Sequence, residues 1–296
     1  MDPHDIKNKH KRSAVFQRLK KEKKKAQREG RRKRKAEADA LGDAAPPKKM
    51  PRTLESMRPK DETTVKEDDE EVMDDVNFDA FAAHFRGEKE ARLLFTTSPN
   101  PSRSILPMVR NIMEVFPRTR FVSRRNYRIK EMVQHASNRG YTNLIIMQEH
   151  AKKLSGIYVI HLPEGPTAYF KLTSFTHTKH IPGHGKLTKH KPEMILNNFT
   201  TRLGMTVGRL LGSLLPTAPE FHGRRVVTFH NQRDFIFFRH HRYIFESGKK
   251  VRMQELGPRF TLKLRWLQDG TFDTKHGEYE WVWKKDLHNS RKTFVL

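Results

Sequence analysis

Apolar residues follow two different spacings in the middle of the chain, and each spacing predicts a different kind of element. Short runs that contain apolar and β-branched residues, at 92–98, 119–122 and 144–147, predict strands. The segments between these runs carry apolar residues three and four positions apart, which predicts helices that end at Pro117 and Gly140. The run at 144–147 is apolar at every position, which is typical of a strand covered on both faces. We therefore expect a β-α-β-α-β order with a partly parallel sheet.

A second block, made of strands and a long helix, follows the first. Paired strands are predicted over 156–162 and 167–175, and the basic, polar segment over 176–191 predicts a loop. Pro192 opens a segment whose apolar residues recur at helical spacing up to Pro216, which predicts one long helix. Further strands are predicted over 225–229, 234–238, 242–245 and 259–267. The fold class expected from these elements is α/β.

Apolar content and charge divide the chain into four expected parts. The first part has too few apolar side chains to offset the entropy lost on ordering, so we expect a disordered or partly helical basic arm. The parts are this arm over 1–59, an acidic linker over 60–90, an α/β region over 91–270 and a C-terminal tail over 271–296. Two successive blocks, about 91–175 and 190–270, make up the α/β region and are candidates for an internal duplication.

The chain is strongly basic, and the excess is not confined to its arm. Its 296 residues include 59 Lys and Arg against 34 Asp and Glu, a formal net charge of +25. Residues 60–79 are acidic, and residues 80–296 carry 37 bases against 16 acids. Such a protein calls for a polyanionic partner, which is nucleic acid, an anionic membrane surface or a very acidic protein. With no membrane-length apolar segment and no secretory signal, we expect a soluble, intracellular protein without a membrane partner.

Metal binding and catalysis find little support in the sequence. The chain has no cysteine, which excludes disulfides, cysteine-ligated metal and a cysteine nucleophile. Four histidines crowd the loop over 176–191: His177, His180, His184 and His190. The lysines between them would repel a divalent cation and no carboxylate lies among them, so we expect a basic loop there and no metal site. Because the acids of the α/β region are isolated, we expect no catalytic residues, no cofactor and no small-molecule substrate.

Three glycines, Gly204, Gly208 and Gly212, repeat at every fourth position. They fall within the predicted long helix and not between a strand and a helix start, which is where a nucleotide-binding loop would place them. Small residues at this interval share one face of a helix. The pattern therefore predicts close packing of that face against a neighbouring element.

Basic residues interleaved with aromatic residues indicate nucleic-acid binding, because cations contact phosphates and exposed rings stack on unpaired bases. The candidate RNA-binding residues are Arg118, Arg120, Arg124, Arg125, Arg128 and Lys130 around the second strand, Lys179, Lys186, Lys189 and Lys191 in the loop, and Arg259, Lys263 and Arg265 on the last strand. A further basic cluster spans 224–242. For each residue, the alternative is a solvated face whose Arg stems cover apolar neighbours. The last strand has alternating apolar and basic residues, so its basic face suits either RNA or another protein chain.

Three segments of the chain together resemble the Brix-domain family of ribosome assembly proteins. They are Leu93–Ser98 with Pro101 and Ser102, Asn197–Gly204, and Gly257–Gly270. The resemblance implies two related α/β halves, each similar to the anticodon-binding domain of certain aminoacyl-tRNA synthetases. It further implies a nucleolar, non-enzymatic assembly factor that binds precursor ribosomal RNA and pairs with a dedicated protein partner. Residues 184–192, 270–273 and 277–281 are similar to a branch of the family that acts in large-subunit maturation.

The sequence and the resemblance together predict a nuclear and nucleolar factor that binds precursor ribosomal RNA of the large subunit. We expect it to scaffold large-subunit assembly and RNA maturation with its dedicated partner and other pre-ribosomal assembly factors. The alternative is a protein-interaction adaptor within pre-ribosomes that touches RNA only incidentally. Crosslinking in cells separates the two, because only the first predicts RNA adducts within 118–130 or 176–191.

Overall fold

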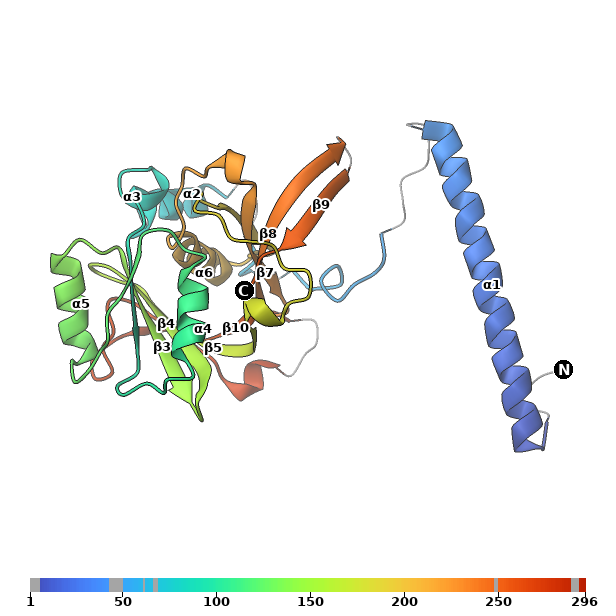
Figure 1. Cartoon of the computed structure of the whole chain (residues 1–296), viewed down its shortest axis with the longest axis horizontal. Coiled ribbons are helices and arrows are strands. Elements are labelled where there is room, and N and C mark those ends of the chain that lie inside the picture. The colour runs from blue at the N-terminus through green and yellow to red at the C-terminus, as the bar shows by residue number, and fades with distance from the viewer. Residues whose placement is uncertain (1–5, 43–49, 61, 66–68, 248–249, 289–292) are drawn as a thin grey trace. The chain divides into compact units, whose positions relative to one another are not determined.

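A computed structural model describes residues 6–42, 50–60, 62–65, 69–247, 250–288 and 293–296, and it divides into two units, residues 1–52 and 53–296 (Figure 1). In the first unit, α1 spans Lys9–Leu41 and has no buried residue. The Asn8 side chain caps it by accepting hydrogen bonds from the backbone N–H groups of His10 and Lys11 at 3.0 and 3.2 Å. The sequence predicted an arm over 1–59 that is either disordered or partly helical. In the structure, residues 9–41 of this segment are helical.

An eleven-stranded sheet organises the second unit. The strands are β1 (Leu93–Thr97), β2 (Thr119–Phe121), β3 (Asn143–His150), β4 (Lys153–His161), β5 (Thr167–Thr176), β6 (Glu193–Asn197), β7 (Arg225–Gln232), β8 (Phe235–Ser247), β9 (Lys250–Glu255), β10 (Arg259–Gln268) and β11 (Tyr279–Val282). Their order across the sheet is β2-β1-β3-β4-β5-β10-β8-β7-β6, with β11 paired to β10 and β9 paired to β8. The mixed α/β class expected from the sequence is confirmed.

One pattern of strand directions occurs twice in the sheet. β1 and β3 are parallel, and β4 and β5 continue antiparallel to them. β6 and β7 are likewise parallel, and β8 and β10 continue antiparallel. Antiparallel pairing of β5 with β10, with Lys171 opposite Lys263, joins the two halves into one sheet.

Helices cover the two faces of the sheet unequally. The helices of the second unit are α2 (Glu70–Phe78), α3 (Ala82–Phe85), α4 (Leu106–Met113), α5 (Ile129–Asn138) and α6 (Arg202–Gly212), with short 3₁₀ helices at Thr178–His180, Phe221–Gly223 and Lys285–His288. α4 and α6 pack on the face that holds Leu93 and Phe95, and α5 packs on the opposite face against Leu94. This alternation along β1 follows from the two-residue period of a strand. No helix among the described residues has the length and apolar character to span a membrane.

The long helix predicted from Pro192 to Pro216 is wrong in its first part. Residues 193–197 form β6, which pairs with β7, and α6 begins only at Arg202. Asn198 adopts a positive φ of 63°, which breaks the chain direction. The Thr201 hydroxyl oxygen then accepts from the Gly204 backbone N–H at 2.8 Å and caps α6. Pairing with β7 outweighs the helical spacing of the apolar residues in this segment.

The strands of the second half also differ from the prediction. The segments predicted over 234–238 and 242–245 are parts of one strand, β8, which is 13 residues long. β9, over Lys250–Glu255, was not predicted, and it folds back on the outer half of β8. In Figure 1 this β8–β9 hairpin extends away from the rest of the sheet.

The acidic segment before β1 packs onto the second unit. Phe81, between α2 and α3, is 1% exposed and belongs to the main hydrophobic core. Asp79 accepts a hydrogen bond from the Arg209 guanidinium of α6 at 2.7 Å, and the same guanidinium lies 4.4 Å from the ring centre of Phe85. Glu71 pairs with Arg202 at 2.7 Å. These contacts connect the acidic segment to α6.

The glycines of α6 pack closely against several segments, as predicted. A Cβ at Gly212 would lie 2.8 Å from the ring of Phe85, and one at Gly204 would lie 2.8 Å from the backbone of Leu296. The third, Gly208, faces Phe199. Larger residues would therefore displace the acidic segment or the C-terminal residues from α6.

Candidate nucleic-acid interface

The first predicted basic cluster lies at one edge of the sheet, around β2 and the start of α5. Arg118 forms an ion pair with Glu90, and the Lys130 ammonium lies 2.7 Å from a carboxylate oxygen of Asp273. Arg124 is half-buried and donates from Nε to the Tyr127 carbonyl at 3.0 Å. Burial lowers the pKa of Arg124. Half of this cluster is thus held by contacts within the chain.

Other cations of the first cluster are exposed, so their charges are accessible to a bound phosphate. Arg120, on the edge strand β2, and Arg125, in the loop that follows, are exposed, and their guanidinium groups have no hydrogen-bond or ion-pair partner in the part of the chain that the structure describes. Arg128 begins α5, where its backbone N–H donates to a Glu131 carboxylate oxygen at 3.0 Å. Arg139, at the other end of α5, is likewise exposed. The sequence did not single out Arg139, because its position beside Arg120 depends on the fold.

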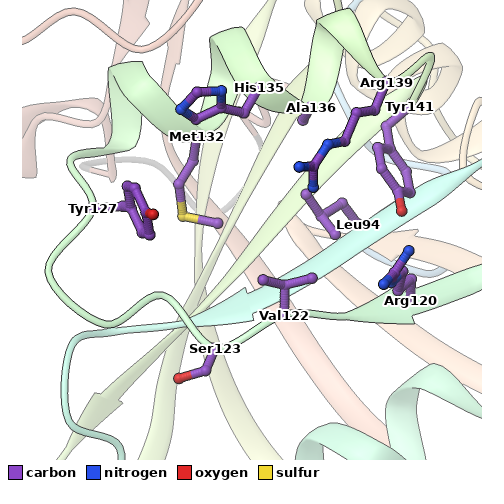
Figure 2. Close-up of a pocket in the computed structure, with 10 residues that line it drawn as sticks. All are labelled: Leu94, Arg120, Val122, Ser123, Tyr127, Met132, His135, Ala136, Arg139 and Tyr141. Atoms are coloured by element: carbon purple, nitrogen blue, oxygen red, sulfur yellow. The ribbon is translucent and has the colours of Figure 1, made fainter.

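A cavity of about 300 Å³ opens among these residues, between α5 and β2. Its lining is Leu94, Arg120, Val122, Ser123, Tyr127, Met132, His135, Ala136, Arg139 and Tyr141 (Figure 2). Figure 2 shows Arg120, Arg139 and Tyr141 gathered at one side, with Tyr127 and Met132 toward the other. Apolar side chains from β1 and α5, together with Val122, form its apolar surface, and polar, aromatic or charged groups form the remainder.

A second cavity, of about 400 Å³, shares Arg120 and Tyr141 with the first. Its other lining residues are Arg92, Arg118 and Thr119. The Arg92 guanidinium lies 4.6 Å from the ring centre of Tyr141 and donates to the Arg139 carbonyl at 3.0 Å. The two adjoining cavities therefore have four arginines in their walls.

The predicted basic loop meets the first cluster through one acid. Lys191 Nζ lies 3.3 Å from a carboxylate oxygen of Glu90, the same residue that pairs with Arg118. The other three predicted loop residues, Lys179, Lys186 and Lys189, are exposed. Glu90 thus brings together two clusters that are far apart in the sequence.

Arg225, from the basic cluster predicted over 224–242, is buried and hydrogen-bonds to the backbone of the basic loop over 176–191. Its guanidinium donates to the carbonyls of Thr188 and His190 at 2.5 and 2.6 Å, and to that of Val115 at 3.3 Å. Burial, followed by the nearby charge of Arg242, lowers the pKa of Arg225 to about 10. Arg225 is therefore a structural cation rather than part of the exposed surface.

The third predicted cluster, on β10, is engaged by the chain itself. The Arg259 guanidinium donates to both carboxylate oxygens of Glu255, at 2.5 and 2.6 Å. Lys263 Nζ lies 4.7 Å from the ring centre of Phe235, and the Arg265 guanidinium lies 4.3 Å from the Trp283 ring. Burial lowers the pKa of Lys263. An aromatic residue of the C-terminal tail thus covers part of this basic face.

The histidines of the loop do not converge. The rings of His177 and His180 lie 6.2 Å apart, and His184 Nδ1 contacts the Ile181 carbonyl at 3.0 Å. Among the described residues, no group of three or more potential His, Asp or Glu ligands is placed to hold a metal ion.

The β8–β9 hairpin carries an exposed apolar face that sequence reasoning missed. Tyr243 lies opposite Met253, and Phe245 lies opposite Val251. Phe245 and Met253 are 66% and 63% exposed. The alternation of charged and apolar residues over 250–253 was a signal for a strand with one apolar face. Exposed apolar faces of this kind are typical of interaction surfaces.

A family model described as the Brix domain matches residues 98–266. The chain belongs to the Brix domain family, as the resemblance of its three motifs indicated. It is 48% identical over 294 residues to ribosome production factor 1 of Mus musculus, and the alignment covers 99% of this chain and 84% of that protein. The protein of the same name in Saccharomyces cerevisiae is 42% identical over 299 residues, covering 99% and 98% of the two chains. A crystal structure of a probable ribosomal biogenesis protein from Aeropyrum pernix aligns with 66% of this chain and 99% of that chain, with a TM-score of 0.43 and 15% identity.

Proposed function

We propose that this protein acts in ribosome biogenesis as a nuclear and nucleolar factor that binds precursor ribosomal RNA and scaffolds large-subunit assembly. Its similarity over nearly the full length to proteins named ribosome production factor 1 supports the biogenesis role. The observation that carries RNA binding is the edge around β2, where the charges of Arg120, Arg125 and Arg139 have no partner among the described residues. Exposed cations without acidic partners are what a phosphate backbone requires.

The proposed surface extends from this edge to the loop. Glu90 holds Arg118 and Lys191 next to each other, so the first cluster and the loop form one continuous basic region. The proposed region also includes Arg124, Arg128 and Lys130 of the first cluster and the exposed Lys179, Lys186 and Lys189 of the loop. A backbone that follows the region would release one condensed counterion for each phosphate it pairs. A secondary place in the proposal goes to the cations that the chain already engages. These are Arg118, Lys130 and Lys191, which pair with acids, Arg259, which pairs with Glu255, and Lys263 and Arg265, which contact aromatic rings.

The relatives are named ribosome production factors, and the proposal for this chain is binding without catalysis. Its surface combines cations and aromatic rings, the groups that hold RNA by its backbone and by stacking. No cofactor or small-molecule substrate is part of the proposed mechanism. The protein would act by holding an RNA segment in place while other factors join.

A salt titration of RNA binding tests the proposal. The probe is a transcript of precursor ribosomal RNA from the large subunit, measured with the full chain. We expect Arg120→Gln with Arg125→Gln to lower affinity about tenfold and to make the slope of log affinity against log salt shallower by about two, since each lost phosphate contact changes it by roughly 0.9. The matched control is Arg103→Gln with Arg110→Gln, two exposed arginines at α4 outside the clusters. Equal slopes for the two double variants would contradict the proposed surface.

The exposed apolar face of the β8–β9 hairpin favours a protein partner as well. Phe245, Val251 and Met253 offer an apolar surface with Lys250 and Arg252 on neighbouring positions. This observation supports the adaptor function, in which other pre-ribosomal proteins are the main ligands. Phe245→Ser with Met253→Ser tests it: loss of co-purifying assembly proteins with unchanged RNA crosslinks would assign the hairpin to a protein partner. Loss of both together would indicate that the RNA and protein contacts depend on each other.

A further inference from the structure

The cavity between α5 and β2 differs from an ordinary basic surface in having an apolar interior. Leu94, Met132 and Ala136 are all buried and belong to the smaller hydrophobic core. Because the cavity reaches these side chains, its occupant must present an apolar or aromatic surface to them. Its volume of about 300 Å³ suits one small planar group and not a helix or a strand.

The formally charged side chains that line the two adjoining cavities are all arginines. The guanidinium groups of Arg120 and Arg139 lie at one side of it, and Arg92 and Arg118 line the adjoining cavity. Two acids lie close by. Glu90 pairs with Arg118, and Glu131 accepts from the Arg128 backbone N–H. Neither acid lines either cavity, so an occupant of the first cavity faces the guanidinium groups of Arg120 and Arg139 and no carboxylate of its lining.

The opposite side of the cavity offers a stacking surface and hydrogen-bonding groups. The Tyr127 side chain is 53% exposed, and its ring meets that of His135 edge-on at 6.2 Å. Ser123, two residues after the end of β2, is exposed and lines the same cavity. A ring that enters beside Tyr127 would meet the Tyr127 hydroxyl, the Ser123 hydroxyl and a His135 nitrogen, which are able to donate to or accept from a heterocycle.

We infer that this cavity receives the base of a single unpaired RNA nucleotide that is turned out of its helix. Arg120 and Arg139, at one side of the cavity, then bind the two phosphates that flank this nucleotide along the RNA chain. An apolar interior with an aromatic wall suits the flat face of a base, and the flanking arginines suit its backbone. A base within a duplex cannot enter, because its faces are stacked and its edge is paired. The inference rests on the proposed function of RNA binding, and it adds that the preferred site is an RNA helix interrupted by an unpaired nucleotide.

Three RNA probes of equal length and nearly equal charge test this inference with the full chain. The first is a continuous hairpin, the second has one bulged adenosine, and the third has the same bulge with the base removed. We expect the bulged hairpin to bind about tenfold more tightly than the other two probes, because stacking of one base on an aromatic side chain contributes roughly this much affinity. The abasic probe retains the backbone kink, so its weaker binding would assign the gain to the base.

Variants at the rim then place the base in the cavity. Ser123→Trp introduces a ring that fills the cavity from an exposed position, and we expect the roughly tenfold preference for the bulge to disappear while binding of the continuous hairpin is retained. Ser123→Ala is the matched control and should preserve the preference. Tyr127→Leu should reduce the preference by removing the stacking surface.

The outcomes separate the two levels of the proposal. Wild-type protein that binds all three probes equally would overturn the base-binding site and leave general RNA binding intact. A preference for the bulge that survives Ser123→Trp would place the base elsewhere and also overturn the inference. Failure to bind any of the three probes would overturn the proposed function itself.

Discussion

The two halves of the sheet share their strand order but differ at the face that α5 covers. In the first half, β1 is followed by α4, β2 and α5 before the parallel strand β3. In the second half, α6 and the short 3₁₀ helix at Phe221–Gly223 lead from β6 to the parallel strand β7. The first half therefore has an additional edge strand and helix, and the cavity with Arg120 and Arg139 in its wall lies between them.

The basic residues of the two halves are used differently as a result. Around β2, Arg120 and Arg125 face solvent without a partner among the described residues. On β10, Arg259 is bound by Glu255, and Arg265 lies against Trp283. Abundance of cations alone therefore does not identify an RNA surface. The distribution of acids and aromatic rings around the cations decides which charges remain available for phosphate.

The largest expected effect concerns a buried histidine in each half, and it tests whether the halves unfold as one unit. Burial lowers the pKa of His161 in β4 to about 4, and burial together with Arg225 lowers that of His240 in β8 to about 3. Because unfolding returns both to about 6.5, the unfolded chain binds more protons below that pH, and stability falls as the pH drops. We expect a loss of roughly 4 kcal/mol at pH 5 relative to pH 8 if both contribute fully.

Urea unfolding at the two pH values measures this loss. The continuous sheet predicts one transition at each pH, because β5 and β10 hold the halves together. His161→Gln should remove about half of the pH dependence. Two separate transitions would break the picture of a single unit, and equal stability at pH 5 and pH 8 would contradict the neutral buried histidines.

A smaller effect is expected when equal numbers of charges are removed from the two halves. Arg120→Gln, Arg125→Gln and Arg128→Gln together should lower RNA affinity by about 10- to 100-fold at moderate salt, since each lost phosphate contact weakens binding. Arg259→Gln, Lys263→Gln and Arg265→Gln together should lower it by about threefold or less, because these charges are already engaged. Filter binding of the two triple variants to the same RNA provides the measurement.

Circular dichroism of both triple variants controls for folding. An equal loss of affinity in the two variants would show that the β10 face contacts RNA despite its partners. A larger loss from the β10 variant would reverse the ranking of the two surfaces.

The smallest expected effect tests the role of Trp283, the tail residue that covers Lys263 and Arg265 on β10. Trp283→Ala should expose Lys263 and Arg265 and raise RNA affinity by about two- to threefold through their freed charges. Trp283→Phe should retain the cover and leave affinity unchanged. Fluorescence anisotropy of a labelled transcript resolves a change of this size. Unchanged affinity in the alanine variant would mean that these cations do not meet RNA even when uncovered.

The sequence predicted most of the first half correctly, because its elements are signalled locally. Apolar spacing and the turn residues Pro117 and Gly140 delimit α4 and α5, and the wholly apolar run at 144–147 lies within β3 between two covered faces. In the second half, the helix predicted from Pro192 was wrong at its start. The spacing of Ile195 to Phe199 suits a helix, whereas pairing with β7 makes residues 193–197 a strand. That pairing involves residues about 30 positions away, which local periodicity does not detect.

The candidate site was predictable in its charges but not in their partners. The basic residues around β2 stand out in the sequence, and the structure places them at one edge. The acids that neutralise some of them, such as Glu90 for Lys191 and Asp273 for Lys130, are 101 and 143 positions away. The cavity needs α5, β1 and β2 together, so no local pattern announces it. Arg139 was missed for the same reason.

The antiparallel pairing of β5 with β10 has a consequence for how the protein is synthesised. The ten residues of β5 leave the ribosome more than eighty positions before β10, their neighbour in the finished sheet. Throughout that interval the nascent chain exposes an unpaired strand edge that includes Phe170 and Leu172, which is a template for aggregation. Chains interrupted before residue 259 would retain this edge permanently, so incomplete translation products should depend on chaperones far more than the full-length protein does.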